Sequence, residues 1–203
     1  QWLPQKLWSE LFHMGYFSYY PLIALTVLAP LFTNRDQFSR VTFVVLASFF
    51  LYYLIYLFLP VAGPQYYFHA VGTEVIQSGH FPQLGNYFRY HTELAPSPGP
   101  EGFFRELVES TQQSGERPTA AFPSSHVGMS TVLMMLLWRI KRPLLVCAFP
   151  FYFFLCCATV YIQAHYLVDV FGGFVTAVIF YALTNWTYTR WRTAKDGARI
   201  IIP

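Results

Sequence analysis

The chain of 203 residues is 55% hydrophobic and only 11% charged, and its formal net charge is +3. A soluble domain carries about twice that charged fraction, and the apolar residues here form long runs, so we expect the chain to fold in a lipid bilayer. The cysteines, Cys147, Cys156 and Cys157, share one apolar stretch and fit neither a disulfide framework nor a zinc site. The basic residues show no pattern that indicates nucleic-acid binding.

Five apolar stretches reach or approach the roughly 20 residues that a helix needs to cross a bilayer. In chain order they cover residues 16–32, 41–59, 127–138, 144–162 and 167–186. The third reaches that length only with its flanks, residues 124–140. Ahead of the first, residues 1–15 carry tryptophan, leucine and phenylalanine side chains that are typical of an amphipathic helix in the membrane interface. The predicted fold is therefore all-α, a polytopic membrane helical bundle.

Residues 60–123 differ in kind from the rest of the chain. They hold most of the prolines, glycines and acidic residues, yet they are still rich in aromatic residues. A structureless loop of this length is uncommon and is usually functional, so we expect a folded cap with short helices over 69–78 and 103–114. We predict one membrane domain over residues 1–203, with 60–123 inserted as a periplasmic or extracellular cap.

The basic residues predict the orientation, because loops rich in lysine and arginine stay on the cytoplasmic side. They cluster in three segments: Arg35 and Arg40; Arg139, Lys141 and Arg142; and Arg190, Arg192, Lys195 and Arg199. All three segments fall on one side if the five stretches span. We therefore expect a multi-pass protein, as in a bacterial inner membrane, with a cytoplasmic C-terminus and the cap outside. This topology leaves open a sixth spanning helix before residue 1.

Ionisable residues stand where the third and fifth stretches begin, on the outward side. His126 follows two serines at the first of these positions, and His165 and Asp169 open the second. Such residues at a membrane span are costly and indicate function. A single histidine there is more often an interfacial polar residue, but three ionisable groups at one interface favour a catalytic site.

The spacing of these residues suggests their chemistry. His165 and Asp169 lie four apart, which places both side chains on one face of a helix. A carboxylate beside an imidazole fixes its tautomer and stabilises the charge that forms when the other nitrogen attacks. His126 could then protonate a leaving oxygen and activate the second nucleophile. Ser124 and Ser125, with the backbone N–H groups of a helix N-terminus, would hold a phosphate.

These stretches resemble the type 2 phosphatidic acid phosphatase (PAP2) superfamily. The family's Pro-Ser-Gly-His motif is similar to residues 123–126, with Ser125 in place of glycine. Its following motif ends in His165 and Asp169, but the arginine of that motif falls on Thr159. The family's first motif is reduced to Arg117-Pro118, because its lysine position is Ser110.

The resemblance implies the roles of the residues that match. His165 is the nucleophile that forms a phosphohistidine, Asp169 supports it, and His126 is the general acid and base. The resemblance implies no metal and no cofactor. Since the usual cations are absent, other residues must meet the phosphate charge, with Arg117 as the first candidate, followed by Arg105 and Arg89.

The function that follows is a lipid phosphatase that hydrolyses a phosphate or pyrophosphate monoester in the outer leaflet. One alternative is a phospho-head-group transferase, because residues 63–68 and the reduced motifs also resemble the inositol-phosphorylceramide and sphingomyelin synthase branch. A second alternative is a non-catalytic lipid transporter or scaffold with a decayed site. The expected partners are a phosphorylated membrane lipid and the bilayer; the sequence does not predict an oligomeric state.

Overall fold

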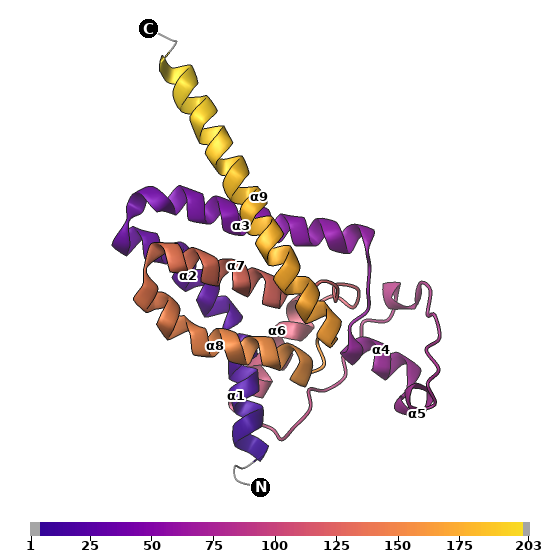
Figure 1. The fold of residues 1–203 in the computed structure, drawn as a ribbon. Helices are drawn as coiled ribbons and strands as arrows, with labels where there is room; N and C mark the ends of the chain where they lie inside the picture. Colours follow the sequence, from indigo (N-terminus) through magenta and orange to yellow (C-terminus); the bar gives the residue numbers. More distant parts are fainter. Residues whose placement is uncertain (1–4, 201–203) are drawn as a thin grey trace.

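The computed structural model describes residues 5–200, with side chains through residue 195. This part of the chain contains nine α-helices and no β-sheet, which confirms the all-α prediction (Figure 1). Five long helices form the bundle: α2 (Tyr19–Thr33), α3 (Phe38–Phe58), α7 (Ser125–Ile140), α8 (Arg142–Tyr161) and α9 (Leu167–Ile200). A short 3-10 helix, Arg35–Gln37, joins α2 to α3.

Helix α7 forms the centre of the bundle. It packs against α2, α3, α8 and α9. Apolar side chains on several sides of it are fully buried, including Val127, Met129, Leu133 and Leu137. A helix that is hydrophobic all round is buried by its neighbours, as α7 is here. This central position fixes His126, the second residue of α7, relative to all the surrounding helices.

The structure has fewer spanning helices than the five predicted. Three segments are long and apolar enough to cross a membrane: Arg35–Phe58, Arg142–Tyr161 and Leu167–Lys195. Helix α1 (Gln5–Phe17) and α2 form a pair bent by 40°, which gives a fourth if it counts as one broken span. Helix α7 has only 16 residues, or about 24 Å at 1.5 Å per residue, and is shorter than a hydrocarbon core of about 30 Å.

The N-terminal helix α1 is more deeply packed than the predicted interfacial helix. It lies against α8 and α6 (Phe103–Gly115). A Cβ atom on Gly15 would come within 2.6 Å of the backbone of Phe154 in α8, so the two helices are in close contact. Leu7 and Trp8 stay exposed, as expected for an interfacial face. The first four residues, with two of the apolar side chains of that prediction, lie outside the described part.

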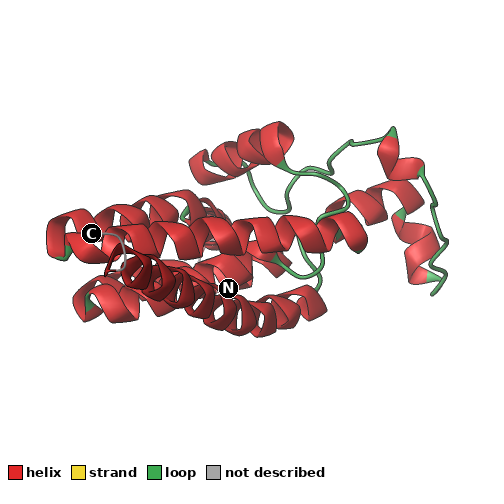
Figure 2. Ribbon diagram, turned by 90° about the horizontal axis from the view of Figure 1, so that it is seen from above, coloured by secondary structure: helices red, strands yellow, loops and turns green. Residues whose placement is uncertain are grey.

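The predicted cap contains short helices joined by irregular segments. The helix predicted over 103–114 is confirmed as α6. The helix predicted over 69–78 is instead two helices, α4 (Pro64–Val71) and α5 (Thr73–Gln77). They are separated by Gly72, whose φ of 87° is a conformation that favours glycine and stops a helix. A 3-10 turn, Tyr87–Arg89, follows. Figure 2 shows the small cap helices at one end of the bundle.

The predicted basic segments gather at the opposite end of the bundle. Arg40 at the start of α3 donates to the side-chain oxygen of Asn185 in α9, at 2.8 and 2.6 Å. Arg139 at the end of α7 lies 5.6 Å from the ring centroid of Tyr181 in α9. The three basic segments therefore share one end, as the loop pattern predicted. Arg199 lies outside the described side chains.

Candidate active site

Three stretches of the chain converge beside the start of α7. The stretch before α4 runs beside the stretch before α7, where Ala121 N donates to Val61 O at 3.0 Å. The turn between α8 and α9 joins them, because Gln65 N donates to Gln163 O at 2.9 Å. The irregular backbone at this point is thus held by hydrogen bonds between segments that are far apart in the sequence.

The N-termini of α7 and α9 are in direct contact. Ser124 N donates to the Asp169 carbonyl at 3.0 Å. A Cβ atom on Gly173 would lie 2.7 Å from Ser124 O, and one on Gly172 would lie 2.8 Å from the Phe122 ring. Glycine is therefore required at Gly173, where the contact is to backbone, as expected where small residues let helices approach closely. This contact brings the two predicted catalytic stretches together.

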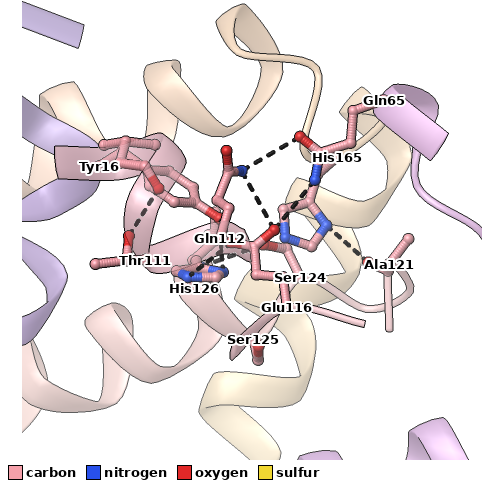
Figure 3. Close-up of polar contacts among 12 residues, drawn as sticks. Tyr16, Gln65, Thr111, Gln112, Glu116, Ala121, Ser124, Ser125, His126 and His165 are labelled. Atoms are coloured by element: carbon pink, nitrogen blue, oxygen red, sulfur yellow. Dashed lines mark hydrogen bonds and ion pairs between the residues drawn. The ribbon is translucent and has the colours of Figure 1, made fainter. Parts of the chain in front are cut away.

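One imidazole nitrogen of His165 is hydrogen-bonded to the protein. Its Nδ1 lies 2.8 Å from the carbonyl oxygen of Ala121 (Figure 3). The same atom lies 3.7 Å from Asp169 Oδ2. A carbonyl only accepts, so Nδ1 carries the proton and Nε2 keeps its lone pair. Asp169 is 1% exposed and accepts from Tyr166 N at 2.7 Å. The carboxylate therefore lies beside His165 as predicted, but the hydrogen bond that fixes the tautomer goes to Ala121.

His126 faces His165 from the start of α7. The two imidazole centroids are 5.9 Å apart. His126 lies between the rings of Tyr16 and Tyr19, each 4.6 Å away, and its Nδ1 is 3.5 Å from the Tyr16 hydroxyl. The predicted pairing of two histidine-bearing helix starts is thus present in the structure. The tyrosines come from α1 and α2, and sequence reasoning missed both.

A second carboxylate, Glu116, lies beside His126. Its Oε1 is 4.0 Å from His126 Nε2 and accepts from the Tyr16 hydroxyl. Its Oε2 accepts from Gln65 at 3.1 Å and from Gln112 at 3.2 Å. Figure 3 shows these side chains gathered around the two histidines, with Glu116 between the rings. Sequence reasoning missed this group, although Glu116 directly precedes the Arg117-Pro118 pair and Gln65 lies in the stretch that resembled the synthase branch.

A cavity of about 300 Å³ opens in front of the two histidines. Arg117, Ser125 and Tyr66 also line it. Burial raises the pKa of the Tyr66 phenol well above its usual value, with the Glu116 carboxylate as the second cause, so the hydroxyl stays protonated. The cavity therefore offers nucleophilic, acidic and cationic groups to one ligand.

The predicted phosphate-binding residues fall into two groups. Ser125 and the exposed Arg117 line the cavity. Ser124 is fully buried, and its hydroxyl caps α7 by accepting from Val127 N at 3.3 Å. An N-cap of this kind stabilises the helix start, which is a structural role.

Arg105 and Arg89 are not brought to the cavity. Arg105 forms an ion pair with Glu109 at 2.9 Å and donates to Gly99 O. Arg89 lies in the cap, 6.0 Å from the ring centroid of Tyr90. The sequence suggested these two arginines only by their charge. In the folded cap they contact nearby residues instead. We therefore do not retain them as phosphate-binding candidates.

The fold and the site define a helical protein with membrane-spanning helices and two opposed histidines, one of them supported by a carboxylate. The chain matches the model of the PAP2 superfamily over residues 1–183 and belongs to that superfamily. This confirms the resemblance drawn from the motifs. Membership implies phosphatase-type activity on a phosphorylated substrate. No curated protein and no solved structure matches the chain.

Proposed function

We propose that the protein is a lipid phosphatase that hydrolyses a phosphate or pyrophosphate monoester of a membrane lipid through a phosphohistidine at His165. The observation that carries this proposal is the arrangement of the two imidazoles. His165 has Nδ1 held by the Ala121 carbonyl at 2.8 Å, and His126 faces it at a centroid distance of 5.9 Å.

In the first step, the lone pair of His165 Nε2 attacks phosphorus and forms the N–P bond. The P–O bond to the lipid breaks, and the leaving oxygen takes a proton from His126. A nucleophile starts about 3–3.5 Å from its target, and a general acid lies about 2.6–3.2 Å from the oxygen it protonates. Both rings line one cavity, so a single phosphoryl group can contact both imidazoles. Asp169 stabilises the positive charge that develops on His165.

In the second step, water completes the hydrolysis. His126, now neutral, takes a proton from a water molecule, whose oxygen attacks phosphorus. The N–P bond breaks, inorganic phosphate leaves, and both histidines return to their starting forms. Arg117 and the positive end of the α7 dipole offset the charge on the phosphate oxygens in both steps.

The cavity also provides a lateral route for a lipid tail. Its wall on the side of α2 and α3 includes Tyr20, Ile23, Phe49 and Tyr53. Tyr20 is 46% exposed and Tyr53 62% exposed, on faces that the other helices leave uncovered. An acyl or prenyl chain would lie along this aromatic wall with its phosphate at the histidines. With the basic end of the bundle in the cytoplasm, the site faces the outer leaflet.

One observation favours the transferase as a second candidate. Beside His126 the cavity is lined by Gln65 and the Glu116 carboxylate, and the cation that lines it is Arg117. Hydrogen-bonding groups of this kind suit the hydroxyls of an alcohol acceptor. The phosphohistidine would form in the same way, and an alcohol would replace water in the second step.

A single assay tests the proposal and separates the two candidates. Purified protein in mixed micelles is supplied with phosphatidic acid, a polyprenyl pyrophosphate or a phosphodiester lipid, with and without diacylglycerol as the alcohol. The phosphatase predicts release of inorganic phosphate from a monoester without an acceptor. The transferase predicts a new phospholipid that forms only with the acceptor. No turnover of any of these lipids, or turnover that survives His165→Ala, would contradict both. His69→Ala, in the exposed part of α4, is the matched control.

A further inference from the structure

Each histidine of the cavity has its own carboxylate. Asp169 lies 3.7 Å from His165, and Glu116 lies 4.0 Å from His126. We infer that Glu116 is a positioning residue for His126, which holds the imidazole in place and stabilises its protonated form for delivery of the proton to the leaving oxygen. This inference rests on the proposed function, because it assigns a role within the same reaction.

The hydrogen bonds around Glu116 indicate that it is ionised. Tyr16 donates to one carboxylate oxygen, and Gln65 and Gln112 donate to the other at 3.1 and 3.2 Å. An ionised carboxylate is an acceptor only, and three donors that converge on both oxygens suit that form. Its side chain is 21% exposed, so water screens the charge only in part.

The network is built from distant parts of the chain. Tyr16 comes from α1, Gln65 from α4, and Gln112 from α6, and all three are nearly fully buried. Buried polar networks cost stability unless every member is satisfied, and here the Gln112 Oε1 atom is left without a donor. A network that meets this cost beside a reactive histidine favours a functional role for the carboxylate it holds.

Tyr16 links the carboxylate to the imidazole directly. Its hydroxyl donates to Glu116, and the same oxygen lies 3.5 Å from His126 Nδ1. Because its proton points to Glu116, the tyrosine oxygen can accept from a protonated Nδ1. Burial lowers the pKa of His126 to about 3, with the neighbouring His165 as the second cause. The link His126–Tyr16–Glu116 offsets part of this cost of protonation and holds the ring between the two tyrosines.

The other groups that face His126 do not supply this charge. From the elements around it come the neutral phenols of Tyr16 and Tyr19, the imidazole of His165 and, across the cavity, the cation of Arg117. His165 itself becomes positive when it is phosphorylated, and its partner is Asp169. Glu116 is therefore the anion placed to offset the charge of His126.

Glu116→Gln tests this role, because it removes the charge and keeps a side chain of similar size. A lipid alkoxide needs a proton to leave, whereas the nitrophenolate of p-nitrophenyl phosphate does not. We expect kcat for phosphatidic acid to fall about 100-fold, and that for p-nitrophenyl phosphate to change only about threefold. Without the anion the protonated imidazole is less stable, so the decline of kcat at high pH should begin about one pH unit lower.

Two further variants keep the test decisive. Glu109→Gln, in the helix that ends just before Glu116, removes a carboxylate that is also hydrogen-bonded, to Arg105 and Ser97, and should leave both rates unchanged. Glu116→Asp restores the charge and should restore the high-pH limb of the profile. An equal fall with both substrates, with an unmoved pH limb, would show a merely structural role. If wild-type protein forms the phosphohistidine at His165 and Glu116→Gln matches its rate on phosphatidic acid, this inference fails while the proposed function stands.

Discussion

His165 and His126 line the same cavity, yet their supports come from different parts of the chain. His165 is held by Asp169, four residues away, and by the carbonyl of Ala121. His126 is held by Tyr16 and by Glu116, which is itself tethered from the cap. The carboxylate beside His165 comes from the first turn of α9, whereas the carboxylate beside His126 is in place only when α1 and the cap are docked. The difference teaches that the charge partner of the nucleophile is local in sequence, while that of its acid partner depends on tertiary assembly.

The largest expected effect tests the local support. Asp169→Asn keeps an oxygen that can accept from Tyr166 N, but it removes the charge beside His165. We expect kcat for the lipid substrate to fall about 1,000-fold with little change in KM, because the charge acts when the imidazole becomes positive. Steady-state phosphate release measures this. Asp36→Asn, in the exposed turn at the opposite end of the bundle, is the control; a fall of less than about tenfold for Asp169→Asn would speak against the assigned support.

The sequence predicts the local part of the site but not the part that depends on tertiary contacts. The pair His165 and Asp169 could be predicted because the two residues are close in the sequence. The predicted helix covers only Asp169, since His165 lies in the turn just before α9 begins at Leu167. The roles of Glu116 and Tyr16 could not be predicted, since nothing near either residue indicates that α1 and the end of α6 meet over His126. The N-cap role of Ser124 needed the position at which α7 starts.

The fold shows the same limit. The apolar stretches were found from composition, and α8 and α9 lie where the sequence predicted helices. The third stretch became the short central helix α7, because burial by neighbours and burial by lipid demand the same apolar residues. The prediction of a single cap helix over 69–78 overlooked the break at Gly72.

The contact between the starts of α7 and α9 should be sensitive to a larger side chain at Gly173. A side chain there meets Ser124 O, since even a Cβ atom would lie 2.7 Å away. We expect Gly173→Val to push α7 from α9, lower activity about 100-fold and lower the thermal midpoint in detergent by about 5 °C. Gly115→Ala, where a Cβ atom meets nothing within 4 Å, should change neither quantity. Full activity of Gly173→Val would show that the separation of the two helix starts is not critical.

The smallest expected effect tests the support that depends on α1. Tyr16→Phe keeps the ring stacked on His126 but removes the hydroxyl that joins it to Glu116. We expect kcat for phosphatidic acid to fall about fivefold to tenfold, which corresponds to the net contribution of a typical hydrogen bond, about 1 kcal/mol. Tyr19→Phe, whose ring is also 4.6 Å from that of His126, should be nearly neutral. Equal rates for the two variants would show that the Tyr16 hydroxyl does not support His126.

The measurement that tests the central claim most directly is the site of covalent phosphorylation. Wild-type protein is mixed with ³²P-labelled phosphatidic acid, quenched in base after milliseconds, digested and analysed by mass spectrometry. The arrangement of His165, with Nδ1 held by Ala121 and Nε2 free, predicts one labelled peptide with phosphate on His165 and none in the Asp169→Asn protein at the same time point. Label on His126, or turnover with no labelled histidine at any time, would contradict the account.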